Sequence, residues 1–187
     1  MPSDTRDRLV RSTSRLLRTQ GYAATGLNQV MVEADAPKGS MYFHFPGGKE
    51  QLAAAAVDLF AARASARLDR HLEENDTVRD AVVAIFDAYV EHLDRTEYRE
   101  GCAVASVALD AASSHEALAE ATGRALRSWT DRLAIALEAE GRSPADAHGL
   151  ATLVIAAIEG TVVMAKGEQS TEPIAAAREA LRTILST

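Results

Sequence analysis

Apolar side chains recur every three or four residues along most of this chain, which is the period of an α-helix. Leu9, Leu16 and Leu17 begin such a stripe, and Gly21 ends it. No segment alternates apolar and polar residues as a half-buried strand does. The pattern therefore predicts an all-α protein of about nine helices: one ending at Gly21, then 26–34, 38–43, 49–73, 78–95, 103–111, 114–139, 144–166 and 172–185.

Short polar and proline-containing segments separate these helices and predict where several of them begin. Ser143 followed by Pro144 and Asp146 combines a capping hydroxyl, a proline in the first turn and an early acid. Thr77 is placed to cap the helix at 78, and Thr25 is expected to cap the helix over 26–34. The run Pro46-Gly47-Gly48 is expected to end the short helix before it.

Composition and charge narrow the class of protein. The chain has 187 residues, of which 47% are hydrophobic, enough to bury a substantial core. Its net charge is −7, yet residues 1–52 carry seven basic and five acidic residues, a local surplus of +2. Because binding to phosphate depends on the local field, the negative total does not exclude nucleic acid.

Other features predict what the protein lacks. The first residues do not resemble a signal peptide, and the apolar run over 150–157 is too short to span a bilayer, so a cytoplasmic location is expected. The single cysteine, Cys102, rules out an internal disulfide. The five histidines are scattered without metal-ligand spacing, and no metal or cofactor is expected.

Residues 21–52 carry the most specific functional pattern. Two short helices joined by a tight turn at Asp35-Ala36-Pro37, with one helix before and a long one after, predict a helix-turn-helix. In that motif the second helix enters the major groove of DNA and the first braces it. We therefore expect a DNA-binding domain at 1–48 and a second helical domain at 49–187. The expected DNA contacts are Thr25, Asn28, Lys38, Gly39, Ser40, Tyr42, Phe43, His44 and Lys49.

The motif residues resemble the TetR family of bacterial regulators. The resemblance rests on Gly21-Tyr22, Thr25, the run Tyr42-Phe43-His44-Phe45 and the run Lys49-Glu50-Gln51-Leu52. Pro46-Gly47-Gly48-Lys49 and Gly101-Cys102-Ala103-Val104-Ala105 further resemble the LmrA/YxaF-like subgroup. The resemblance implies an all-helical repressor with a DNA-binding head and a ligand-binding, dimerising body. Asp35 replaces the glycine common at the turn, and aspartate tolerates the left-handed backbone there.

Two sets of residues in the body are predicted from this resemblance and from helix periodicity. A small hydrophobic effector is expected to contact Phe86, Tyr89, Cys102, Val104, Ser106, Val107, Trp129 and Leu133. The last two helices are expected to form a four-helix bundle in a homodimer, through Leu150, Val154, Ile158, Val162, Ile174, Leu181 and Ile184. Burial of the same faces inside one chain is the alternative.

Three other functions are consistent with the sequence. The same fold could serve a transcriptional activator, or a scaffold that does not bind DNA. A helical enzyme using Cys102 would need a neighbouring base or a cofactor loop, and the sequence contains neither pattern. We therefore expect a binding protein without catalytic residues, whose partners are operator DNA, a small effector and a second copy of the chain, with no membrane.

Overall fold

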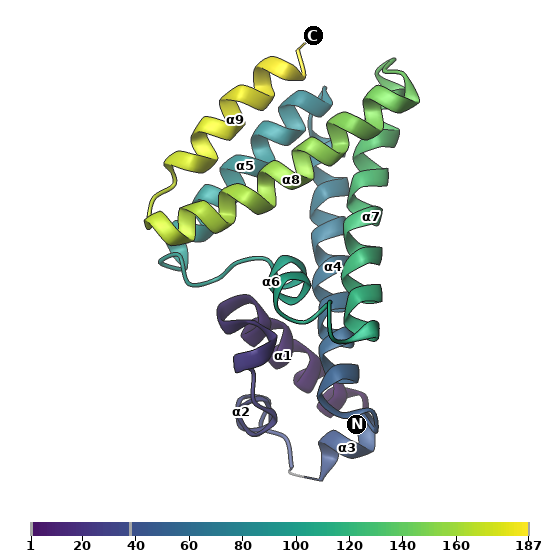
Figure 1. Cartoon of the computed structure of the whole chain (residues 1–187), viewed down its shortest axis with the longest axis vertical. Coiled ribbons are helices and arrows are strands. Elements are labelled where there is room, and N and C mark those ends of the chain that lie inside the picture. Colours follow the sequence, from purple (N-terminus) through teal and green to yellow (C-terminus); the bar gives the residue numbers. More distant parts are fainter. Residues whose placement is uncertain (1, 38, 187) are drawn as a thin grey trace. The chain divides into compact units, whose positions relative to one another are not determined.

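The computed structural model describes residues 2–37 and 39–186. Within these ranges the chain is all-α, as predicted, and contains no strand. Its helices (Figure 1) are α1 (Pro2–Ala24), α2 (Leu27–Glu33), α3 (Ser40–His44), α4 (Gly48–Glu74), α5 (Val78–Arg95), α6 (Ala103–Asp110), α7 (Glu116–Ala139), α8 (Pro144–Glu168) and α9 (Glu172–Ile184).

The predicted caps are confirmed at two helices and wrong at a third. Thr77 and Ser143 accept hydrogen bonds from the backbone N–H groups of Asp80 and Asp146, at 3.1 and 3.3 Å. The residue before α2 is Gly26, which has no capping side chain. The Thr25 hydroxyl instead donates to the carbonyl of Gly21 at 2.6 Å. A local turn at the end of α1 therefore uses the hydroxyl that the sequence assigned to the cap of α2.

The first compact unit comprises residues 1–63 and 102–125. It joins α1, α2, α3 and the first part of α4 to α6 and the start of α7, and α1 packs against α2, α3 and α6. Its core includes Leu17, Val30, Phe45, Leu52 and Val107. The unit thus divides the chain differently from the predicted boundary after residue 48, because α6 belongs to the same compact body as the helix-turn-helix.

The second compact unit comprises residues 64–101 and 126–187. Here α9 packs against α5 and α8, and α5 also contacts α8. Among its hydrogen bonds, the indole N–H of Trp129 donates to Ser65 Oγ at 3.2 Å. Arg132 also donates to both carboxylate oxygens of Asp69 at 2.7 Å.

Helix α8 is unusual in its composition. It is long and apolar enough to cross a membrane by length and hydropathy alone, although only 33% of that window is buried in the structure. One such helix is weak evidence for a membrane span. A single protomer therefore leaves much of an apolar helix uncovered.

Candidate nucleic-acid interface

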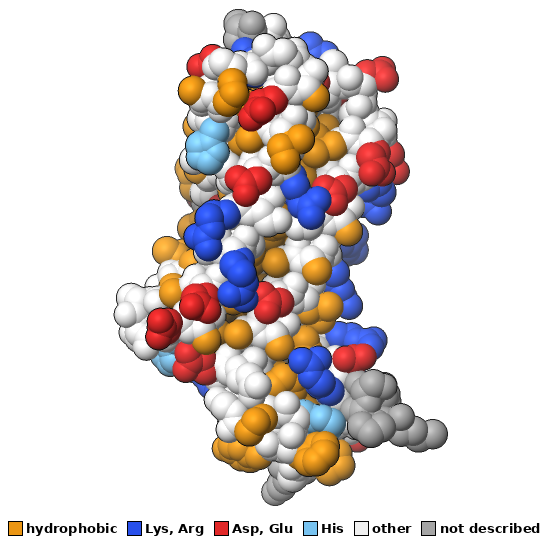
Figure 2. Space-filling model, turned by 90° about the vertical axis from the view of Figure 1, so that its right-hand side faces the viewer, with side chains coloured by type: hydrophobic (Ala, Val, Ile, Leu, Met, Phe, Trp, Pro, Cys, Tyr) orange, Lys and Arg blue, Asp and Glu red, His pale blue; other side chains and the backbone are white. Residues whose placement is uncertain are grey.

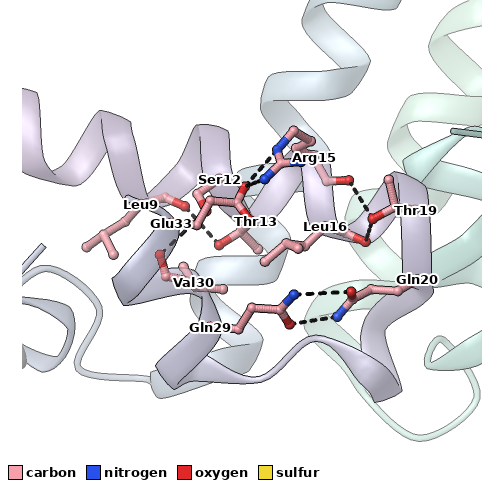
Figure 3. A network of polar contacts seen from close by, with 10 residues as sticks. All are labelled: Leu9, Ser12, Thr13, Arg15, Leu16, Thr19, Gln20, Gln29, Val30 and Glu33. Atoms are coloured by element: carbon pink, nitrogen blue, oxygen red, sulfur yellow. Dashed lines mark hydrogen bonds and ion pairs between the residues drawn. The ribbon is translucent and has the colours of Figure 1, made fainter. Parts of the chain in front are cut away.

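A network of polar contacts fixes α2 against α1 (Figure 3). Arg15 Nε on α1 donates to Glu33 Oε1 on α2 at 2.7 Å, and the side-chain amides of Gln20 and Gln29 bond to each other in both directions, at 2.9 and 3.3 Å. Between these pairs, Val30 is buried beneath α1. Polar pairs thus flank a buried apolar contact, which sets the position of the helix that braces α3.

Helix α3 divides its side chains between core and solvent. Met41 and Phe45 are buried, whereas Tyr42 is 63% exposed and Phe43 is 78% exposed. Exposed aromatic rings are costly to hydrate, so their position on this short helix indicates a contact surface. Apolar side chains gather at the lower end of the view in Figure 2, where Figure 1 places α2 and α3. The face of α3 that the sequence assigned to DNA is the face that the protein leaves open.

The other predicted DNA contacts on and near α3 differ in how far they are exposed. Asn28 and Gly39 are exposed, while Ser40 and His44 are half-buried. The Ser40 hydroxyl donates to the Pro37 carbonyl at 2.7 Å, which stabilises the start of α3. The prediction for Lys38 lies outside the described residues.

The turn before α3 agrees with the expectation from sequence. Asp35 has a φ of 47°, in the left-handed region where glycine is common and aspartate is tolerated. This backbone geometry reverses the chain between α2 and the segment leading to α3. The substitution of aspartate for glycine at this turn is thus compatible with the motif.

Two predicted contacts are engaged inside the protein. Thr25 is 2% exposed and its hydroxyl bonds to Gly21, so that hydroxyl is not directed at a partner. Lys49 Nζ lies 4.2 Å from the centroid of the Tyr22 ring and donates to the Ala23 carbonyl at 3.4 Å. Burial lowers the pKa of Lys49, and the nearby Asp110 carboxylate acts in the opposite direction. Lys49 therefore braces α4 against the end of α1.

Asp110, at the end of α6, is a functional candidate that the sequence did not reveal. Its carboxylate accepts a hydrogen bond from the Ala23 backbone N–H at 2.8 Å, across 87 residues of chain. The Tyr22 ring also meets the His115 ring edge-on, at 5.0 Å between centroids. No local sequence pattern predicts an acidic residue whose hydrogen-bond partner is so distant in sequence. The end of α1 is thus tied to α6 and to the segment just after α6.

The predicted effector contacts fall in both compact units. Cys102, Val104 and Val107 in the first unit are buried, and Ser106 is half-buried. In the second unit Tyr89 is half-buried, and the buried members are Phe86, Trp129 and Leu133. Because Trp129 already donates its N–H to Ser65, a ligand would have to displace that bond to use it. Among the described residues, no group of three His, Cys, Asp or Glu side chains is arranged to hold a metal ion.

The predicted dimer contacts are mostly occupied within one protomer. Leu150 is half-buried and Ile184 is exposed, but the other members are buried, namely Val154, Ile158, Val162, Ile174 and Leu181. These five side chains are buried in the unit where α5, α8 and α9 pack together, so within this protomer they expose little surface to a partner. Helix α8 exposes other large apolar side chains: Leu153, Val163 and Met164.

Comparison with known proteins accounts for this arrangement. Residues 9–56 match the model of bacterial regulatory proteins of the tetR family, and residues 78–180 match that of the LmrA/YxaF-like transcriptional regulator C-terminal domain. The HTH-type transcriptional regulator LmrA of Bacillus subtilis is 33% identical over 171 residues, 91% of each chain. The HTH-type transcriptional repressor NemR of Escherichia coli is 25% identical, over 98% of this chain and 95% of NemR.

A solved structure shows the same fold. The TetR-family transcriptional regulator from Cytophaga hutchinsonii superposes with a TM-score of 0.86 at 22% identity, covering 99% of this chain and 94% of that one. The two family models match successive parts of the chain, and the helix-turn-helix geometry lies within the first of them. The chain belongs to the TetR family of transcriptional regulators, with an LmrA/YxaF-like C-terminal domain.

Proposed function

We propose that this protein is a dimeric transcriptional repressor that a small hydrophobic effector releases from its operator. The family is one of DNA-binding regulators whose members typically dimerise, and the relative NemR is named a repressor. A regulator that acts on chromosomal DNA works in the cytoplasm, which is the location we propose. Release requires that the effector bind one conformation of the protein better than the other.

The packing of α6 in the same compact unit as the DNA-binding helices is the observation that carries this proposal. Val104 and Val107 of α6 are among the predicted effector contacts. Asp110, at the end of α6, accepts a hydrogen bond from the Ala23 backbone N–H. A shift of α6 would therefore act on the end of α1 without an intervening element. Transmission through the long helix α4, which begins beside Lys49, is the alternative route, and the route through α6 is more direct.

DNA contact is proposed for the exposed part of the motif. Tyr42, Phe43, Asn28 and Gly39 are open to a partner. The sequence prediction for Lys38 is kept as a further contact. Thr25 and Lys49 are better described as residues that position α2 and α4. A dimer would present two copies of α3 to half-sites about 34–36 Å apart or a multiple of that distance.

Replacing Tyr42 by alanine should weaken operator binding roughly 5- to 30-fold, about 1–2 kcal/mol, since the ring and hydroxyl both contact the DNA backbone in this proposal. Tyr42→Phe should retain most of the affinity that the ring provides. Because tyrosine is uncharged, neither variant should change the salt dependence. Lys38→Ala should lower the slope by about 0.9 for each bound subunit, or about 1.8 for the dimer. Gel-shift titrations at several salt concentrations measure both quantities. Wild-type affinity in both alanine variants would contradict this interface.

Replacing Val163 by glutamate should convert the dimer to a monomer at micromolar concentration. Val163 is 55% exposed on α8, so the charge costs the protomer little but would be buried without a partner in the dimer. We expect the dimer dissociation constant to rise at least about 100-fold. Sedimentation equilibrium measures it. The matched control is Ile135→Glu on α7, an apolar side chain 67% exposed that should leave the dimer intact. A dimeric Val163→Glu protein would place the interface elsewhere.

Deletion of the gene in its host separates a repressor from an activator. If the protein represses, transcription from the promoter that it binds should rise on deletion and return to its basal level when the wild-type gene is restored. A fall on deletion would favour the activator, which remains the second candidate because the fold serves either role.

A further inference from the structure

A groove of about 580 Å³ lies between α1 and α4 in the first compact unit. Its apolar surface comes from Val10 on α1 and from Ala55 and Leu59 on α4. Its charged lining consists of Arg6, Asp7, Arg11, Asp58 and Arg63. The volume is within the range of pockets that hold small organic ligands. None of these residues was assigned to DNA, to the effector or to the dimer.

The positive charges in this groove exceed the negative ones, and they are weakly compensated. Arg63 has no ion pair or hydrogen bond to any other residue that the structure describes. The Arg6 guanidinium lies 5.2 Å from the centroid of the Phe45 ring, and Arg11 reaches Asp7 only at 4.0 Å. Asp58 also pairs with Arg124 of α7, at 3.3 Å. In a chain of net charge −7, this local surplus of positive charge would attract an anion.

The distribution of charge also limits the anion. The aspartates on α1 and α4 lie in the lining itself, so a second negative charge on the ligand would meet a carboxylate. A carboxylate fits the planar fork of a guanidinium with two hydrogen bonds. The apolar strip formed by Val10 and Leu59 suits a hydrocarbon body beside that head group. These features favour a monoanion with an apolar body over an inorganic dianion.

We propose that the groove between α1 and α4 binds amphipathic monocarboxylates, with Arg63 as the principal partner of the carboxylate. This site lies in the DNA-binding unit itself and is separate from the effector contacts proposed on α6. One of its walls is α1, which packs against α2 and α3, so an occupant that prefers one spacing of α1 and α4 changes operator affinity. Binding of the carboxylate itself does not depend on the proposed repressor function.

The test uses biphenyl-4-carboxylate as the probe and the uncharged biphenyl-4-carboxamide as its control. Methyl groups of valine and leucine are labelled with carbon-13 in the whole protein, and their chemical shifts are followed during titration. Val10 and Leu59 report the groove, while Val107 and Leu133 report the predicted effector contacts. The variants are Arg63→Gln and, as the matched control, Arg127→Gln, another exposed arginine with no ion pair among the described residues.

We expect the carboxylate to shift the Val10 and Leu59 methyl signals with a dissociation constant below about 1 mM. Arg63→Gln should weaken this binding roughly fivefold or more, and Arg127→Gln should leave it unchanged. Shifts confined to Val107 and Leu133, or equal binding of the carboxamide at the groove, would overturn the proposal. So would an Arg63→Gln protein that binds the probe normally. If Arg63→Gln weakens operator binding and lowers its salt slope without probe, the arginine serves the DNA backbone, and the proposal also fails.

Discussion

Replacing Phe43 by glutamate should abolish operator binding while leaving the fold intact. The Phe43 ring is 78% exposed on α3 and meets the His44 ring edge-on, at 5.0 Å between centroids, so its loss removes little packing. In the proposed complex the new carboxylate faces the phosphates and base edges of the major groove, where it repels the DNA and leaves acceptors without donors. We expect a loss of at least about 100-fold in affinity, roughly 3 kcal/mol.

Fluorescence anisotropy with labelled upstream DNA measures this loss, and circular dichroism checks that the helices are retained. The matched control is Ile135→Glu, which makes the same charge change at an exposed apolar side chain of α7. Its operator affinity should stay near that of the wild type, because Ile135 belongs to the other compact unit and is not part of the helix-turn-helix. If both variants bind equally well, α3 is not the recognition element.

Replacing Gly21 by alanine should destabilise the protein by roughly 2–3 kcal/mol, which for a chain of this length lowers the melting temperature by about 4–12 °C. Gly21 has φ 77° and ψ −178°, a backbone conformation that residues with a Cβ rarely adopt. A Cβ there would also lie 3.0 Å from Asp110 Oδ2. Thermal and denaturant unfolding measure the change.

The double variant with Asp110→Ala separates these two causes. Asp110→Ala alone removes the acceptor of the Ala23 N–H and should cost roughly 0.5–1.5 kcal/mol. In the double variant, Asp110→Ala also removes the crowding of the new Cβ. The loss of stability in the double variant should therefore be smaller than the sum of the losses in the two single variants. The strain in φ remains in both backgrounds. Strict additivity would mean that Asp110 does not constrain the end of α1, and a fully stable Gly21→Ala protein would contradict the strained geometry.

Local sequence patterns predict the helices and their order well. The caps of α5 and α8 were found because a capping residue and the N–H that it accepts lie three residues apart. The bounds of α5 agree with the prediction at both ends. The faces of α3 also follow from periodicity, since buried Met41 and Phe45 are separated by one helical turn. Such features depend on neighbours that are close in sequence, which is why they could be predicted.

Contacts made in the folded chain engage some of the side chains that the sequence predicted to bind DNA. The Thr25 and Lys49 side chains belong to residue types suited to phosphate, but Gly21, Ala23 and Tyr22 are nearer partners in the folded chain. Asp110 could not be found because its partner Ala23 lies 87 residues away. The sequence shows which side chains could bind a partner, but it does not show which of them are engaged in contacts within the protein.

The residues predicted to form the dimer show the same limit on helix α8. Periodicity identified an apolar stripe through Val154, Ile158 and Val162, and that stripe is buried within the protomer. The helix is apolar on the opposite side as well, at Leu153 and Val163, and the pattern alone does not say which side meets its own chain. Packing against α5 and α9 decides the question.

A hydroxyl-radical footprint of the wild-type protein on its upstream DNA tests the central claim most directly. Two copies of α3 carried by a dimer should protect two tracts of the backbone, separated by about one helical turn or a multiple of it, at physiological salt. The Phe43→Glu protein should protect neither tract. Sequence-independent protection along the whole fragment, or no protection by the wild-type protein, would contradict the assignment of this chain as an operator-binding regulator that reads DNA through α3.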